Sequence, residues 1–146
     1  MANTGTSAIL AVMGGDEVVG PGVRTLDDLC AEVHKGLPYG AVEALQGSLQ
    51  VTAGELADAL QLPVRTLARR RQEHRLRADE SDRVYRLARV WAHAIEVFGS
   101  PPRAAEWMRR PNRALRQAAP LSLLDTDIGA EQVDDVLGRI EHGIFD

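Results

Sequence analysis

At 146 residues, with 45% hydrophobic and 26% charged residues, the chain has the composition of a globular protein of one or two small domains. Its net charge of −4 argues against nucleic-acid binding by the chain as a whole, and its low aromatic content of 4% favours a helical core of aliphatic side chains. One cysteine excludes an intrachain disulfide and a thiolate zinc site, and the lack of a signal peptide or of roughly 18 consecutive apolar residues predicts a cytoplasmic protein with no membrane span.

The first 24 residues are expected to form a flexible or partly ordered arm, because they hold five of the thirteen glycines. A helix is predicted to begin after Thr25, an N-cap that two aspartates follow in the first turn, and to end at Gly36. A second helix is predicted from about Tyr39 to Leu45. The chain is therefore expected to continue from the arm into a helical region.

The next segment has the pattern of a helix-turn-helix, the motif whose second helix enters the major groove of DNA. Thr52, with a glutamate three residues later, forms a capping box at the start of a short helix. A tight turn at Gln61-Leu62 leads to Pro63, which suits the first turn of the second helix. Residues 61–116 carry fourteen arginines against six acids, whereas the segments on either side each carry a net charge of −6.

The second helix of this motif is rich in arginine, whose donors suit phosphates and guanine edges. A solvated or salt-bridged arginine face is the alternative, but the capped helix and the turn before it favour DNA binding with a strong salt dependence. Arg71 lies four residues after Leu67 and could lie partly over the core. The predicted DNA-binding residues are Arg65, Thr66, Arg69, Arg70, Arg71 and Arg75.

The strongest periodic signal predicts a long helix over residues 79–98, which Gly99 ends. Its apolar stripe includes a tryptophan that is expected in the core. Arg83, Arg86 and Arg89 lie three apart on one side of it. They could contact phosphates or the carboxylates of a partner, although a solvated face is the simpler expectation.

A further helix is predicted to begin at Ser100-Pro101, and a final one to run from about Gly129 to His142. Trp107 is expected in the core or as the anchor of an interface, since tryptophan is enriched at binding hot spots. The acidic residues near the end match no calcium-binding loop, and the histidines are scattered, so no metal, cofactor or catalytic site is predicted. Ile144-Phe145 is expected to fold back onto the core or to insert into another protein.

Two segments resemble the Xre-type antitoxins that are paired with RES-domain toxins: residues 105–115 (AEWMRRPNRAL) and residues 120–130 (PLSLLDTDIGA). Patterns within residues 76–99 and 137–144 strengthen the resemblance, which covers about residues 25–146. One departure is Arg116-Gln117, where glycine is expected after Ala-Leu, and another is the acidic total charge.

The resemblance implies an all-α protein, with a Cro/repressor-like helix-turn-helix module followed by a helical toxin-binding domain. We assign the arm to residues 1–24, the DNA-binding region to residues 25–99 and the toxin-binding domain to residues 100–146. The resemblance also implies a type II antitoxin that blocks the active site of a cognate NAD-degrading RES toxin. Such an antitoxin represses its own operon as a homodimer on operator DNA, within a hetero-oligomeric toxin-antitoxin complex.

This hypothesis predicts a protein that is not an enzyme. The alternatives are a stand-alone transcription regulator with a C-terminal dimerisation or ligand-sensing module, and a scaffold that has lost DNA binding. The predicted toxin-binding residues are Trp107, Asn112, Arg139, Glu141, His142, Ile144, Phe145 and Asp146.

Overall fold

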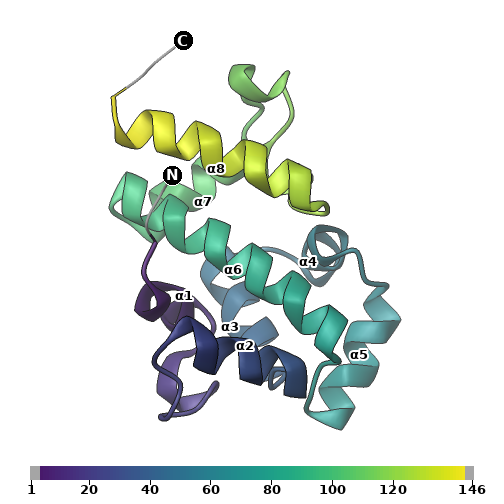
Figure 1. Cartoon of the computed structure of the whole chain (residues 1–146). Coiled ribbons are helices and arrows are strands. Elements are labelled where there is room, and N and C mark those ends of the chain that lie inside the picture. Colours follow the sequence, from purple (N-terminus) through teal and green to yellow (C-terminus); the bar gives the residue numbers. More distant parts are fainter. Residues whose placement is uncertain (1–3, 144–146) are drawn as a thin grey trace.

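The structure, a computed structural model, describes residues 4–143 and is built there from helices without a β-strand (Figure 1), which confirms the expected all-α fold. None of its helices is long and apolar enough to cross a membrane, as far as the described residues go. The α-helices are α1 (Thr6–Val12), α2 (Leu26–Lys35), α3 (Gly40–Leu49), α4 (Ala53–Leu60), α5 (Val64–Glu73), α6 (Ala78–Phe98), α7 (Pro101–Arg109) and α8 (Asp127–Glu141). Three short 3-10 helices are η1 (Gly15–Glu17), η2 (Arg113–Leu115) and η3 (Pro120–Leu123).

Half of the α-helices (α2, α4, α7 and α8) begin after a Ser or Thr whose side chain accepts from a free backbone N–H of the first turn. Thr25 and Thr52 each form a complete capping box with the acid three residues later. The side chain of Thr126 accepts from the N–H of Gly129, so α8 begins at Asp127, two residues before the predicted start. Pro63 lies at the N-cap position of α5, just before the first turn where the sequence placed it.

The N-terminal segment differs from the expected arm. In the part of it that the structure describes, α1 packs against α3 and α6 and buries Ile9 and Leu10. The glycines permit close packing there: Gly14 has a φ of +103°, and a Cβ at this position would overlap the side chain of Val18. The number of glycines predicted flexibility. That prediction missed α1 because the apolar side chains that α1 packs against lie far away in the sequence.

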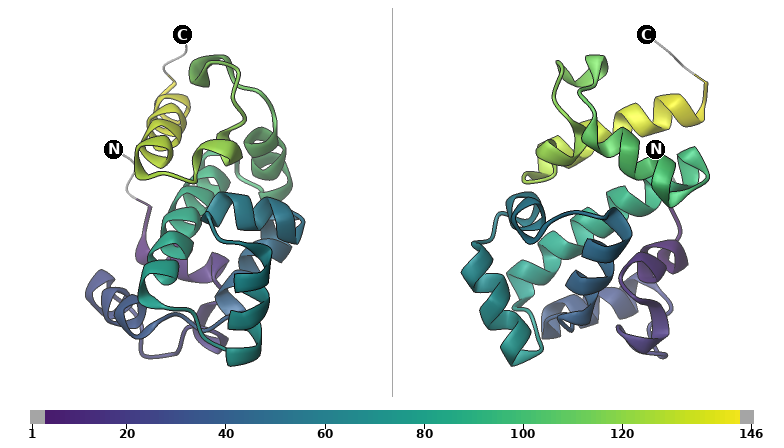
Figure 2. Two further views of the ribbon diagram at one scale, coloured as in Figure 1. Left: turned by 90° about the vertical axis from the view of Figure 1, so that its right-hand side faces the viewer. Right: turned by 180° about the vertical axis from the view of Figure 1, so that it is seen from behind.

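Helix α6 is the axis around which the other helices pack (Figures 1 and 2). It contacts α1, α2, α3, α4, α7 and α8, and its buried apolar side chains belong to one continuous hydrophobic cluster. Trp91 is fully buried there, as expected, and its indole N–H donates to the hydroxyl of Ser48 at 2.9 Å. In Figure 1 and in the right-hand view of Figure 2, α8 runs alongside α6, which also contacts α1 to α4, so a single helix supports the N-terminal and C-terminal halves.

Candidate nucleic-acid interface and partner surface

Helices α4 and α5 form the predicted helix-turn-helix. Gln61 adopts a left-handed conformation with a φ of 54°, which ends α4, and the N–H of Leu62 donates to the carbonyl of Ala57 at 2.9 Å. Arg83 on α6 donates to the carbonyl of Gln61 at 3.1 Å and so fastens the turn to the central helix. The buried Leu67 holds α5 against the core. These contacts fix how α5 is presented.

The outer face of α5 carries cations that no other described residue neutralises. Arg65 and Arg69 lie one helical turn apart, both are exposed, and the structure shows no ion pair for either among residues 4–143. Thr66 between them is half-buried. Val64, the first residue of α5, leaves 51% of its surface exposed, although it is apolar. The face therefore combines free positive charge with an exposed apolar group at the N-terminus of the helix.

Arg70 requires a correction, because the structure does not place it on this face. It is only 3% exposed, its Nε donates to Glu80 at 2.8 Å and its Nη1 donates to Glu73 at 3.0 Å. The hydrogen bond that Arg70 donates to Glu80 is the main reason that the pKa of Arg70 is raised, and burial opposes that effect. Glu80 also accepts from the backbone N–H of Arg77 at the start of α6. Arg70 therefore connects α5 to α6 and is closed to a phosphate.

The remaining two arginines predicted to bind DNA lie near the end of α5. Arg71 has a side chain that is 72% exposed and 3.9 Å from Glu43, so it is Arg70, three residues after Leu67, that covers the core. Arg75 donates to the carbonyl of Gly36 and is thereby engaged within the module. Of the predicted set, the structure gathers Arg65, Thr66, Arg69 and Arg71 on α5 as exposed or partly exposed side chains.

The arginines along α6 form connections inside the protein, in place of the solvated face that was the simpler expectation. Arg83 reaches the turn of the helix-turn-helix, as described above. Arg86 pairs with Asp127 at 2.7 Å, and Arg89 pairs with Asp134 at 3.2 Å. Both acids belong to α8, so these pairs fasten the C-terminal half onto the central helix.

His93 completes this connection and was missed by the sequence reasoning. Its side chain is 1% exposed, with Nδ1 at 3.1 Å from Asp134 and Nε2 at 3.4 Å from Glu141. Burial lowers the pKa of His93, but the hydrogen bonds and charges of the two acids outweigh that effect, so the pKa is raised. A usable signal was present: Arg89 and His93 lie four apart on α6, and the two acids lie seven apart on α8, as residues on one helix face do.

The predicted toxin-binding residues lie at several places in the C-terminal half. Trp107 is half-buried and packs against Phe98, with 5.4 Å between the ring centroids. Glu141 is engaged with His93, whereas Arg139 and His142 are exposed near the end of α8. The structure thus brings none of them together into one compact cluster. Ile144, Phe145 and Asp146 lie outside the described residues.

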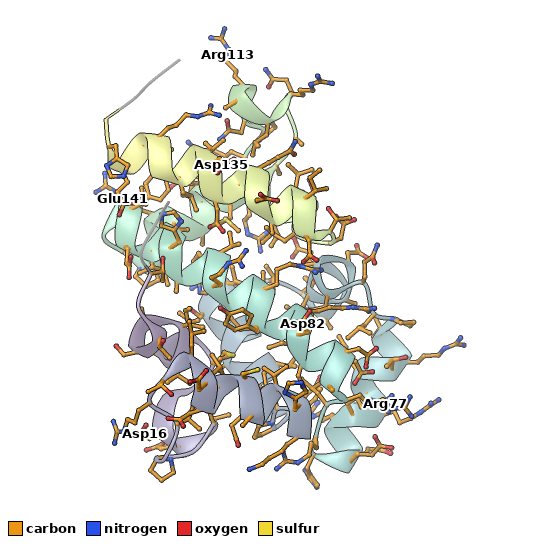
Figure 3. All side chains as sticks on the ribbon, in the orientation of Figure 1. Asp16, Arg77, Asp82, Arg113, Asp135 and Glu141 are labelled. Atoms are coloured by element: carbon orange, nitrogen blue, oxygen red, sulfur yellow. The ribbon has the colours of Figure 1, made fainter. Side chains whose placement is uncertain are left out.

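Asn112 closes a loop that projects from the body beside α8. Its side-chain oxygen accepts from the N–H of Ala114 at 2.9 Å, its N–H donates to Ala118 at 3.0 Å, and its carbonyl accepts from Gln117 at 2.8 Å. Figure 3 shows the labelled Arg113 at the tip of this loop, beyond Asp135 on α8. Asn112 therefore shapes the loop, and the exposed arginines of the loop face outward.

Comparisons with known proteins match both halves of the chain. Residues 28–89 match the Antitoxin Xre-like helix-turn-helix domain, and residues 93–143 match the Antitoxin Xre/MbcA/ParS C-terminal toxin-binding domain. The chain is 39% identical over 118 residues to "Antitoxin Xre" of Photorhabdus laumondii and 34% identical over 119 residues to "Antitoxin Xre" of Yersinia enterocolitica. Each of these two alignments covers 80% of both chains.

A solved structure is also similar. A chain in the crystal structure of the M. tuberculosis MbcT-MbcA toxin-antitoxin complex aligns with a TM-score of 0.57 and 26% identity, over 74% of the present chain and 96% of that chain. The boundary between the two family matches falls at residues 90–92, within α6. The central helix is therefore shared between the two matched regions.

Proposed function

The chain belongs to the Xre family of type II antitoxins, which pair a helix-turn-helix with a toxin-binding domain, and on this premise we propose the following function. The protein neutralises a RES-type, NAD-degrading toxin by covering the active site of that enzyme. It also represses its own operon, as a homodimer whose α5 helices enter the major groove. The observation that carries the proposal is the presence of both matched domains in one chain, over residues 28–143.

The exposed face of α5 supports the DNA-binding part of this proposal. In helix-turn-helix proteins the N-terminal residues of the second helix contact base edges. Arg65 and Arg69 have the donors for guanine or phosphate, and the exposed Val64 suits contact with a thymine methyl group. Because their charges are unpaired among the described residues, binding these two arginines to DNA breaks no ion pair within the protein.

The DNA-binding part is tested by changing both arginines to alanine. The binding of a DNA fragment from upstream of the operon is measured by fluorescence anisotropy at several salt concentrations. If both arginines contact phosphates, Arg65→Ala with Arg69→Ala should reduce the salt slope by about 1.8 and weaken binding at least about tenfold, since each released counterion contributes about 0.9 to the slope.

A matched control removes two exposed arginines from the C-terminal half, Arg103→Ala with Arg113→Ala. The control has the same net charge as the α5 variant and should keep wild-type affinity. Equal losses in the two variants would mean that only the overall charge matters, and α5 would then not be the DNA-reading helix.

The C-terminal match supports the toxin-binding part and favours an antitoxin over a stand-alone regulator. Residues 117–146 carry seven acids against one arginine, which suits the cationic nucleotide cleft of an NAD-degrading enzyme. We propose that the end of α8 and residues 144–146 enter that cleft, with Arg139 and His142 beside it.

Co-expression with the adjacent reading frame tests this part. Expression of that frame alone should lower cellular NAD and stop growth, and the present chain should restore both. Deletion of residues 144–146 should abolish protection while operator binding survives. If the truncated chain still protects the cells, the assignment of the tail is wrong.

A further inference from the structure

An open depression of about 310 Å³ lies between α8 and the loop of residues 112–118. Apolar side chains from three elements line it, namely Leu115 of η2, Leu123 of η3 and Val136 of α8. Exposed charged side chains border it, namely Arg116, Asp135 and Arg139. Polar atoms make up more of the lining than apolar atoms, so the depression suits a polar group that is carried on a short apolar stem.

Arg116 and its neighbour have an unusual backbone for their residue types. Arg116 has a φ of 55° and Gln117 has a φ of 69°, so two consecutive residues with side chains are left-handed. This conformation is unfavourable for a residue other than glycine. Arg116 is the C-cap of η2, just as Gln50, Gln61 and His74 are left-handed C-caps of α-helices, but only Arg116 is followed by a second left-handed residue with a side chain in the described chain. Glycine would adopt the loop without this cost, so the backbone conformation alone does not account for an arginine at position 116.

The guanidinium of Arg116 is available to a partner. Within the described residues it forms no hydrogen bond and no ion pair, whereas Arg70, Arg86, Arg89 and Arg109 are all paired within the protein. The loop that carries it is fixed by the hydrogen bonds of Asn112, so the position of its Cα is defined before binding. An exposed arginine on a backbone that is already fixed loses less conformational freedom on binding, and arginine is enriched at binding hot spots.

We propose that the depression receives a carboxylate-bearing side chain of the toxin, with Arg116 as its bidentate partner. This inference rests on the proposed function and adds the chemistry of one contact to it. Arginine holds a carboxylate with two parallel hydrogen bonds, and these gain strength when the pair is shielded from water. The methylene groups of an aspartate or glutamate would rest on Leu115 and Val136.

The charge around the depression favours a protein carboxylate over nucleic acid. Asp135 borders it directly, and the segment of residues 117–146 is acidic as a whole. A polyanion would be repelled by this surrounding charge, whereas a single carboxylate needs only the local cation. Arg116 is therefore a specificity determinant for the cognate toxin.

Two glycine substitutions distinguish an effect on folding stability from an effect on toxin binding. Arg116→Gly should raise Tm by a few degrees, because glycine accepts the left-handed backbone, and should raise the Kd for the purified product of the adjacent reading frame at least about tenfold. Gln50→Gly relieves a similar left-handed residue that does not line the depression, and it should raise Tm without changing that Kd. Arg113→Ala, which removes a charge from the same loop, should also leave the Kd unchanged.

The outcomes distinguish this inference from the proposed function. An unchanged Kd for Arg116→Gly, beside a wild-type chain that binds, would overturn the inference alone. A lower Tm for that variant would show that the side chain stabilises the fold, and would also overturn it. If the wild-type chain does not bind the product at all, the proposed function fails and the inference fails with it.

Discussion

Substitution of two glycines in α8 by alanine should change stability in opposite directions. Gly129 is buried in the first turn, and a Cβ there would lie only 2.9 Å from both the carbonyl carbon of Leu123 and the hydroxyl of Thr126, and closer still to the Leu123 carbonyl oxygen. Because backbone must move to admit it, overpacking costs about 1–3 kcal/mol. Loss of the Thr126 cap costs about 1 kcal/mol more, and the better helix propensity of alanine returns about the same amount.

Gly129→Ala should therefore lower the free energy of unfolding by about 1–3 kcal/mol. Gly138, nine residues later in the same helix, has no atom within 4 Å of a Cβ outside its own chain neighbours and helix backbone. Gly138→Ala should raise stability by about 0.5–1 kcal/mol, because alanine is the better helix former. Each kcal/mol corresponds to roughly 2–4 °C in Tm for a chain of this size.

Urea unfolding followed by circular dichroism at 222 nm measures both changes, with thermal melts as a second readout. The comparison is internal, since both variants carry the same chemical change in the same helix. The reasoning is refuted if Gly129→Ala unfolds at the same urea concentration as Gly138→Ala, or at a higher one. That result would mean that η3 moves away from α8 without cost.

Two further predictions concern buried charge. The pKa of His93 is raised in the folded chain, so the protonated side chain contributes its full stabilisation below the unfolded pKa of about 6.5. This stabilisation is lost as the pH rises through the raised pKa of the folded chain. Urea titrations at several pH values should therefore show stability falling over that range in the wild type and staying level in His93→Gln. Glu80→Gln should lower the urea midpoint far more than Glu73→Gln, because Glu80 is the buried partner of Arg70 and Glu73 is 55% exposed; equal midpoints would contradict this.

Local signals made most of the fold predictable. The capping boxes at Thr25 and Thr52 and the periodic apolar residues of α6 act within a few residues of each other, so they can be identified in a single sequence. The helix-turn-helix followed from the same kind of evidence. Helix α1 was not predicted, because its stability comes from packing against α3 and α6, which lie far away in the sequence.

The candidate sites were less predictable because pairing partners decide which charged side chains are available. The sequence pattern of α5 does not distinguish Arg69 from Arg70. They differ in the structure because the turn into α6 brings Glu80 beside Arg70. Arg86 and His93 are engaged by acids 41 to 48 residues away. Composition identified the basic segment correctly, but only the tertiary structure separates the arginines that hold the fold from those that remain free.

The position of the family boundary within α6 has a consequence for how these antitoxins can exchange partners. The α6 side chains that hold α8 are encoded on both sides of residues 90–92, since Arg86 and Arg89 lie before this boundary and His93 lies after it. A recombinant that joins the helix-turn-helix of one relative to the toxin-binding domain of another would inherit a central helix whose charges no longer match α8. Exchange of toxin specificity by gene shuffling therefore requires compensating changes along α6, and successful chimeras should retain the whole of α6 together with its own α8.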